Sequence, residues 1–260
     1  MNLRSIYWIF RKEMAIYLST PLAYIIAAVF LALAGFMFYT IMLYFAQNYA
    51  RMAMMGTENL DLTQEILRPF LGNLAFLFLL IVPLMSMRLL AEERRLGTIE
   101  LLMTSPVRTV EIVLGKFLAG VAMNFLIYLL TIVFPLFLRL YGRPDWGPIV
   151  SGYLGVLLLL MAFVGLSMFA SAITSSQLVA AAVSFGILIM LWIIGWISYA
   201  QAASGPLQQI VQYISIVDHL EDFYKGVIDS QHVVYFLSLA LLGLSLTYLA
   251  TESHRWRATS

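Results

Sequence analysis

Six stretches of the sequence are apolar over a length that can cross a lipid bilayer. The hydrocarbon layer is about 30 Å thick and needs about 20 helical residues. The stretches are continuously apolar instead of alternating, which favours helices over barrel strands, because a lipid-exposed backbone must satisfy its own hydrogen bonds. The sequence therefore predicts an all-α integral membrane protein, with six transmembrane helices near residues 22–45, 70–90, 114–138, 149–172, 178–200 and 232–250.

The composition agrees with a membrane protein. Hydrophobic residues make up 62% of the chain and charged residues 11%, whereas soluble domains are about half apolar and about one quarter charged. The formal net charge of +1 argues against a surface that binds nucleic acid. The chain has no cysteine, which excludes disulfides, thiolate metal sites and cysteine nucleophiles. We expect residues 1–260 to form a single transmembrane domain.

The segment before the first span has the pattern of an amphipathic helix. Apolar side chains recur every three or four residues over 2–18, while Arg4, Arg11 and Lys12 lie mostly off that stripe. This pattern predicts a helix in the membrane interface, with Pro21 at the turn into the bilayer. The alternative is a helix that simply extends the first span into water. The first span begins about 20 residues into the chain and does not have the cleavage pattern of a signal peptide, so we expect it to be retained.

Basic residues in the connections predict the orientation of the spans, because they are enriched on the cytoplasmic side. With six spans both termini share one side, and that side carries ten basic residues against five on the other. The ten are Arg4, Arg11, Lys12, Arg88, Arg94, Arg95, Arg108, Lys116, Arg255 and Arg257, and the five are Arg51, Arg68, Arg139, Arg143 and Lys225. The sequence therefore predicts that both termini are cytoplasmic.

A dense charged segment, residues 91–118, joins the second span to the third. It holds eight of the chain's formal charges, and its first part also has an apolar helical face. Gly97 lowers helix propensity there and predicts a bend or a close approach by another backbone. Ser105 followed by Pro106 predicts the start of a second helix that continues into the third span. Glu111 lies near that amino end, where a negative charge is favoured.

This charged segment resembles the signature of type 2 ABC transporter permeases, which has the elements EER, GT, ELL, SP and GK in that order. Here the five elements are Glu92-Glu93-Arg94, Gly97-Thr98, Glu100-Leu101-Leu102, Ser105-Pro106 and Gly115-Lys116. The six-span layout and the amino-terminal helix also match, so the resemblance covers essentially the whole chain. Residues 219–229, followed by a last span and a basic end, further resemble the gliding-motility-type branch of these permeases.

The resemblance implies a permease subunit that works with a separate ATPase. In that family the segment equivalent to 91–113 is a cytoplasmic coupling helix that docks in a groove of the nucleotide-binding subunit. The alternative for this segment is a solvated, positive-inside connection. The docking residues that the resemblance implies are Glu92, Glu93, Arg94, Arg95, Gly97, Thr98, Glu100, Leu101, Leu102, Ser105, Pro106 and Arg108.

The resemblance also implies the other members of the complex. Two copies of the ATPase subunit are expected, together with a second permease half that is identical or related, in a bacterial cytoplasmic (inner) membrane. The gliding-motility-type likeness adds an accessory membrane protein with an extracytoplasmic domain. ATP and Mg are expected on the ATPase subunit, with no cofactor bound by this chain.

The chain has no ATP-binding loop of the form G-x-x-x-x-G-K-[ST]. Lys116 is followed by Phe117, and Val110 stands where the first glycine of that loop would be. We therefore expect that this chain is not an enzyme and that the ATPase activity resides on the partner subunit.

The content of the spans bears on the cargo. Ionisable groups inside a membrane mark ion and proton pathways, and five of the six predicted spans carry none away from their ends. This favours an exporter of a lipidic or amphipathic substrate. The alternative is a mechanical or signalling permease that transports nothing and drives an extracytoplasmic partner. A secondary transporter or channel is disfavoured by the uncharged spans and by the signature.

The connection before the last span holds an acidic and aromatic cluster. Its members His219, Glu221, Asp222 and Phe223 are candidates for an outer gate or a partner contact, and the alternative is an ordinary acidic loop. Their spacing does not reproduce H-E-x-x-H or another zinc pattern, so no metal site is expected.

Overall fold

A computed structural model describes residues 2–54, 63–98, 107–142, 144–199 and 211–258 of the chain, with the backbone alone for 50–54, 141, 197–199 and 254–258. Six long apolar helices account for most of these residues, and each is long and apolar enough to cross a membrane. The described residues contain no strand. The prediction of an all-helical chain with six candidate spans is confirmed.

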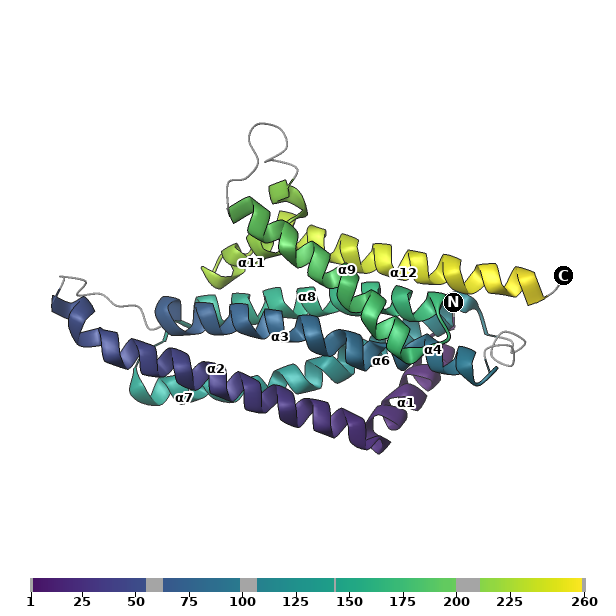
Figure 1. The fold of residues 1–260 in the computed structure, drawn as a ribbon, viewed down its shortest axis with the longest axis horizontal. Coiled ribbons are helices and arrows are strands. Elements are labelled where there is room, and N and C mark those ends of the chain that lie inside the picture. Colours follow the sequence, from purple (N-terminus) through teal and green to yellow (C-terminus); the bar gives the residue numbers. More distant parts are fainter. Residues whose placement is uncertain (1, 55–62, 99–106, 143, 200–210, 259–260) are drawn as a thin grey trace.

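The six candidate spans are built from ten helical elements of the described chain. In chain order these are α2 (Pro21–Met54); η1 (Thr63–Leu67), α3 (Arg68–Ser86) and α4 (Arg88–Arg95); α6 (Thr109–Leu129), η2 (Leu130–Ile132) and α7 (Val133–Tyr141); α8 (Trp146–Ile173); α9 (Gln177–Tyr199); and α12 (Ser230–Ala258). Two shorter helices, α1 (Leu3–Ser19) and α11 (Ile216–Tyr224), lie outside the spans. Both termini lie at the same end of the bundle, as an even number of spans requires (Figure 1).

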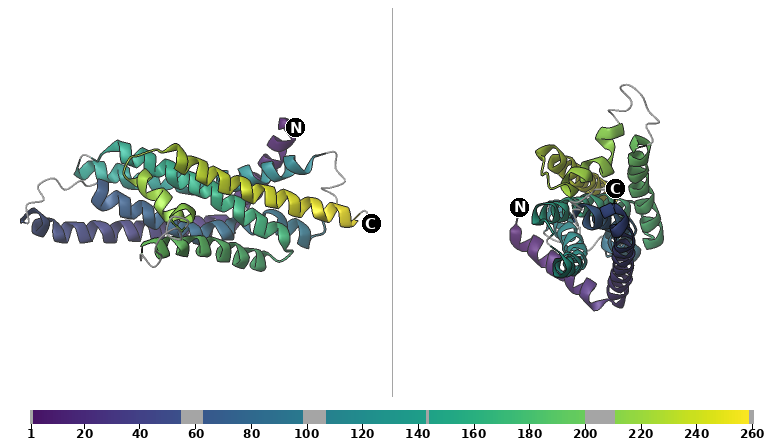
Figure 2. Two further views of the ribbon diagram at one scale, coloured as in Figure 1. Left: turned by 90° about the horizontal axis from the view of Figure 1, so that it is seen from above. Right: turned by 90° about the vertical axis from the view of Figure 1, so that its left-hand side faces the viewer.

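Helix α8 is the centre of the bundle. It contacts α3, α4, α6, α9, α11 and α12, and 78% of its most apolar stretch is buried, with 72% for the α3 span. The corresponding share is only 17% for α2 and 28% for α9 and α12. These three helices lie at the outside of the bundle, which the end-on view in Figure 2 shows. Many of their apolar side chains are exposed. An apolar outer face suits a helix bathed in lipid.

Helices α8 and α12 approach each other closely at two glycines, Gly165 and Gly243, where the two backbones are in direct contact. A Cβ atom added at Gly243 would lie 2.3 Å from the carbonyl carbon of Gly165, and one added at Gly165 would lie 2.9 Å from the carbonyl oxygen of Ala240. Small residues at such a crossing let two backbones approach each other, which is a common way to pack helices in membranes.

Helix α1 lies at an angle to the spans and packs on α6 (Figure 1). Thr20 is extended and separates α1 from α2, and Pro21 takes the first position of α2, where its missing N–H is not needed. A Cβ atom at Gly115 of α6 would lie 2.8 Å from Ile9, so this glycine lets α1 and α6 meet closely. The location of α1 in the membrane interface remains a prediction.

The helix that leads into the third span begins later than the helix start predicted at Ser105 and Pro106, two residues that lie outside the described part of the chain. Val107 and Arg108 are not helical, and α6 starts at Thr109, with Arg108 in an extended conformation as its N-cap. Glu111, at the third helical position, accepts hydrogen bonds from the backbone N–H groups of Arg108 (3.4 Å) and Asn2 (2.5 Å). The acidic side chain, which satisfies free N–H groups at the amino end, therefore marks the start of this helix better than Pro106 does.

Candidate functional site

The charged segment after the second span begins as a continuation of that span. Helix α4 follows α3 after a single residue, Met87, and ends at Arg95. Gly97 then adopts a left-handed backbone with φ of +68°, a conformation that glycine takes without strain and that commonly ends a helix. The bend expected at Gly97 is therefore present.

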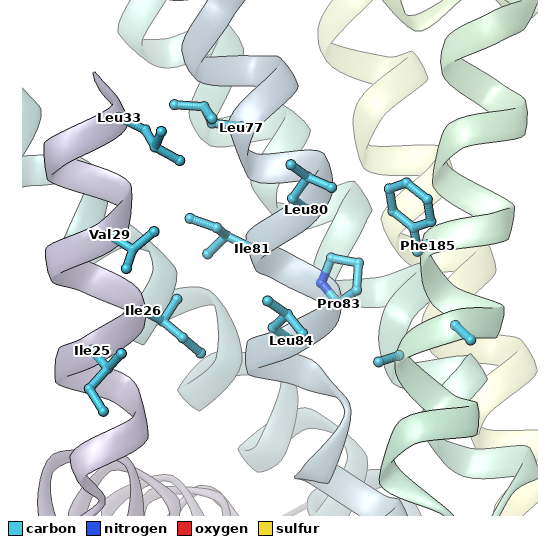
Figure 3. A pocket seen from close by; sticks show the side chains of 12 residues that line it. Ile25, Ile26, Val29, Leu33, Leu77, Leu80, Ile81, Pro83, Leu84 and Phe185 are labelled. Atoms are coloured by element: carbon cyan, nitrogen blue, oxygen red, sulfur yellow. The ribbon is translucent and has the colours of Figure 1, made fainter. Parts of the chain in front are cut away.

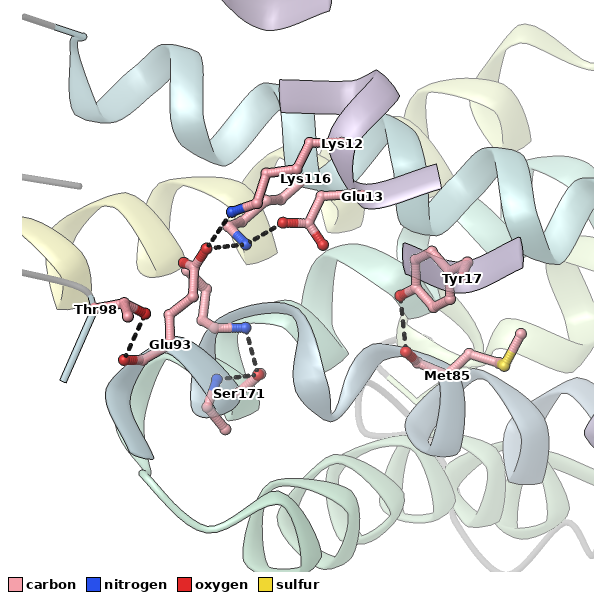
Figure 4. Close-up of polar contacts among 10 residues, drawn as sticks. Lys12, Glu13, Tyr17, Met85, Glu93, Thr98, Lys116 and Ser171 are labelled. Carbon is pink, nitrogen blue, oxygen red and sulfur yellow. Dashed lines mark hydrogen bonds and ion pairs between the residues drawn. The ribbon is translucent and has the colours of Figure 1, made fainter. Parts of the chain in front are cut away.

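Lys116 of α6 is the centre of a charged cluster at this end of the bundle. It is only 2% exposed, and its Nζ atom lies 2.6 Å from Glu13 Oε1 of α1 and 3.0 Å from Glu93 Oε1 of α4 (Figure 4). Lys12 of α1 approaches the same Glu93 oxygen at 3.4 Å. Two lysines face two carboxylates, so the cluster is neutral. A buried charge is tolerated when it is paired in this way.

Ser171 of α8 holds the amino end of α4. Its Oγ accepts hydrogen bonds from the backbone N–H groups of Leu90 (3.1 Å) and Ala91 (3.0 Å), and it donates to the Met87 carbonyl (2.8 Å). The first N–H groups of a helix have no partner within the helix. A serine from the central helix therefore supplies the cap that the sequence of α4 does not.

Tyr17 joins α1 to the end of α3. Its hydroxyl donates to the Met85 carbonyl at 2.8 Å, and the Arg88 guanidinium lies 4.4 Å from the centre of its ring. Burial raises the pKa of Tyr17 well above the ordinary value, although Arg88 works in the opposite direction. The phenol therefore stays neutral and keeps the proton that it donates. Helices α1, α4 and α6 thus form one connected unit. We name the four charged residues that join them, Lys12, Glu13, Glu93 and Lys116, the Lys116 cluster.

The predicted docking residues fall into three groups. Arg95, Thr98 and Arg108 are exposed, as is the backbone at Gly97, while Glu92 and Arg94 are partly buried. Glu93 is buried in the Lys116 cluster, where it faces Lys116. The remaining residues, Glu100, Leu101, Leu102, Ser105 and Pro106, lie outside the described residues.

The predicted outer-gate residues all belong to α11, which lies well away from α1 and α4 in the bundle (Figure 1). Glu221 pairs with Arg68 at the start of α3 (2.5 Å). Phe223 is fully buried, and a Cβ atom at Gly155 of α8 would lie 2.7 Å from its ring, so this glycine makes room for it. Ser151 of α8 also donates to the Phe223 carbonyl at 2.6 Å. These contacts hold α11 against α8 and the start of α3.

His219 and Asp222 share a partner that the sequence interpretation missed. His232, at the start of α12, lies 2.6 Å from His219 (Nδ1 to Nδ1) and 2.9 Å from Asp222 (Nε2 to Oδ2). Burial lowers the pKa of His219. Burial raises the pKa of Asp222, but hydrogen bonds from His232 and Lys225 outweigh it, so the pKa is lowered. Within the described part of the chain, no group of three His, Asp or Glu side chains could hold a metal ion.

An apolar groove of about 580 Å³ runs between α2, α3 and α9 (Figure 3). Ile26 and Leu33 line it from α2, Leu80 and Ile81 from α3, and Phe185 from α9. None of its twelve lining residues is charged. It lies between two helices that are mostly unburied, α2 and α9, so it faces the surroundings of the bundle.

A bundle of six helices that can each cross a membrane, with an ion pair that joins its second and third spans, is the architecture of a multi-pass membrane protein. The chain belongs to the ABC-2 family of transporter proteins, whose pattern matches residues 7–251. It is therefore a multi-pass membrane permease. The family's permease domain has no ATPase activity, which implies an ATPase partner. A comparison with curated proteins found no match.

Proposed function

We propose that this chain is the permease half of an ATP-driven exporter with a lipidic or amphipathic cargo. The observation that carries the proposal is the groove between α2, α3 and α9, which is apolar along its whole lining. A hydrated ion would find no polar ligand there, whereas an acyl chain would bury apolar surface, worth about 0.8 kcal/mol per CH₂ group. The groove is also open toward the side of the bundle, where a lipid would enter.

The proposed dock for the ATPase is the segment 91–113. Its support is mechanical, because α4 is continuous with the second span and is joined to α6 through Glu93 and Lys116. A push on the exposed residues that follow α4 would therefore move the second and third spans together. Arg95 and Arg108 are the exposed charges of the described part of this segment, and exposed charges steer encounter and set register.

The rest of the assembly is proposed from the family. Two ATPase subunits would bind two permease halves, either two copies of this chain or this chain and a relative. The termini and the docking segment would face the cytoplasm of a bacterium, in agreement with the excess of basic residues at that end. The likeness to the gliding-motility-type branch adds an accessory protein, which would meet the opposite end near His219, Glu221, Asp222 and Phe223.

Cargo transport is tested in vesicles that contain this chain, its ATPase and a fluorescent phospholipid. We expect ATP-dependent movement of the lipid, and Ala182→Trp, which fills the groove, should slow it by about tenfold while ATP hydrolysis continues. Val179→Trp is the matched control, because Val179 is exposed on the same helix but does not line the groove. ATP hydrolysis with no lipid movement in the unchanged protein would contradict the exporter and favour the mechanical alternative.

The dock is tested by copurification of the ATPase subunit. The double charge reversal Glu92→Lys with Arg95→Glu should abolish copurification, because both side chains reach the surface, whereas Arg139→Glu at the opposite end should not. Glu93 is unsuited to this test, since its reversal would also break the buried pair with Lys116. Normal copurification by the double variant would exclude these two side chains from the dock.

A further inference from the structure

A chain of three hydrogen bonds crosses from α11 to α12. The Nε2 atom of His219 lies 3.0 Å from the Tyr213 carbonyl oxygen, and its Nδ1 atom lies 2.6 Å from Nδ1 of His232. The Nε2 atom of His232 lies 2.9 Å from Asp222 Oδ2. Both imidazoles therefore use both of their nitrogens, and the two rings meet through like atoms.

The number of protons on the two rings follows from their partners. A carbonyl oxygen and a carboxylate can only accept, so each of the two Nε2 atoms must carry a proton. The contact between the two Nδ1 atoms needs one proton, because two lone pairs would repel and two N–H groups would collide. The four nitrogens thus hold three protons, one more than two neutral imidazoles hold, and the pair carries one positive charge.

The charged surroundings indicate where this proton resides. On α11 the pair faces Asp222 and Asp218, and Lys225 at the end of α11 pairs with Asp222. On α12 the ring of Tyr235 stacks on His219, with 3.9 Å between ring centres. The sequences of α8 and α9, which also pack against α11, contain no charged residue. His219 is the more buried ring, and the Asp222 carboxylate contacts His232, so the geometry favours the extra positive charge on the side of the pair that faces this carboxylate.

We propose that His219 and His232 form a binding site for a single proton, which fastens α11 to the start of α12, and that gaining or losing one proton loosens this fastening. With one proton fewer, the two Nδ1 lone pairs face each other or a lone pair of His232 faces Asp222. With one proton more, two N–H groups point at each other across 2.6 Å. This inference does not depend on the cargo or on the identity of the ATPase.

The pH dependence follows from proton linkage. Two separated histidines with ordinary pKa values bind one proton between them at about pH 6.5. Above that pH the unfastened state binds fewer protons than the fastened state, so the fastening weakens as pH rises. Below that pH the unfastened state binds up to two protons, so the fastening weakens as pH falls. The contact is therefore strongest at about pH 6.5 and weaker on both sides.

The proton count can be measured directly. The chain has three histidines, so His254→Gln, at the other end of α12, leaves only this pair. Protein labelled with ¹⁵N-histidine and purified without a histidine tag should show three protonated nitrogens and one unprotonated nitrogen at pH 6.5. Two protonated and two unprotonated nitrogens at that pH would overturn the proposal, as would four protonated ones.

The fastening itself is measured by hydrogen exchange of the amides of α11 in lipid nanodiscs, corrected for the intrinsic pH dependence of exchange. Protection should be maximal near pH 6.5 and fall about tenfold at pH 5 and at pH 8.5, as a shift of one pKa unit would produce. His254→Gln should keep this profile, and His232→Gln should flatten it. Constant protection across this range, or an unchanged profile in His232→Gln, would exclude the proton site.

A more conservative variant tests the same proposal without removing either imidazole, so that a loss of folding is less of a concern. Asp222→Asn keeps an oxygen that accepts from His232 but removes the negative charge that holds the proton. We expect the alkaline arm of the protection profile to move to lower pH, by about one pH unit, while the amplitude remains. An alkaline arm that stays in place would show that the carboxylate does not hold the proton, which contradicts the proposed pairing.

Discussion

Glu93 and Lys116 belong to two separate elements of the permease signature, and in the folded chain they form an ion pair of 3.0 Å. The pair joins α4 to α6 directly, and Glu13 extends it to α1 through the same lysine. Two parts of a sequence signature therefore meet inside the protein and not at its surface. The ion pair provides a physical reason for a glutamate and a lysine at these two positions, which is to hold α4 of the second span against α6 of the third.

Replacing Lys116 by methionine should destabilise the chain strongly. The change keeps the volume of the side chain but leaves Glu13 and Glu93 buried without the lysine between them, and breaking a buried pair costs about 3–5 kcal/mol. The midpoint of thermal unfolding in nanodiscs should fall well below that of the unchanged protein. The double variant Lys116→Met with Glu13→Gln should recover part of the loss, because it removes one of the two stranded charges.

The control for this prediction is Lys12→Met. Lys12 is 55% exposed and lies 3.4 Å from Glu93, and an exposed pair contributes about 0–1 kcal/mol. The unfolding temperature should therefore change little. Equal losses for Lys12→Met and Lys116→Met would mean that the burial of Lys116 in the Lys116 cluster does not account for its contribution to stability.

Ser171→Ala should weaken the connection between α4 and the central helix. The backbone N–H groups of Leu90 and Ala91 would lose their only cap from α8, and an unsatisfied buried donor costs about 1–3 kcal/mol. We expect a lower unfolding temperature together with weaker stimulation of the partner's ATPase. Ser245→Ala is the matched control, since Ser245 is exposed and donates to the Leu242 carbonyl of its own helix. A comparable loss in this control would show that the contact of Ser171 with α4 does not explain the effect of Ser171→Ala.

The sequence predicted the fold well because span length and continuous hydrophobicity are local properties. The orientation of Glu93 could not be predicted in the same way. A charged side chain in a dense charged segment can face solvent or another helix. Glu93 faces the interior because the fold places Lys116 beside it, and that placement cannot be predicted from the spacing of the two residues in the sequence. One signal was present: Glu13 lies among the apolar residues of the α1 stripe, and a charge on an apolar face indicates a buried partner.

His232 shows a second limit of sequence interpretation. It lies 13 positions after His219, beyond the helical spacings by which nearby side chains are paired, and the two meet because the chain turns between α11 and α12. Gly226, with φ of +93°, lies in that turn. Glycine at a left-handed position is a turn signal, but it does not specify which side chains the turn brings together.

Gly243→Ala should separate α8 from α12. The new methyl carbon would lie 2.3 Å from the carbonyl carbon of Gly165, and a backbone atom cannot move aside as a flexible side chain can. Overpacking of this kind costs about 1–3 kcal/mol, and thermal unfolding should report it. Gly186→Ala in α9 is the control, because nothing lies within 4 Å of its added carbon; alanine there should be neutral or stabilise by about 0.5–1 kcal/mol.

Gly97→Ala should weaken the coupling between this chain and its ATPase partner, although the added methyl group meets no neighbouring atom. Nothing lies within 4 Å of a Cβ atom at this position, but its φ is +68°, and a left-handed backbone costs an alanine about 1–2 kcal/mol. The path of the chain as it leaves α4 should change, and the ATPase stimulation measured with the partner should fall by about tenfold. Gly97→Asn should restore most of it, because asparagine tolerates this conformation, whereas Gly72→Ala in α3, equally free of contacts, should have no effect. If asparagine were as harmful as alanine, the left-handed backbone would not be the reason for glycine at this position.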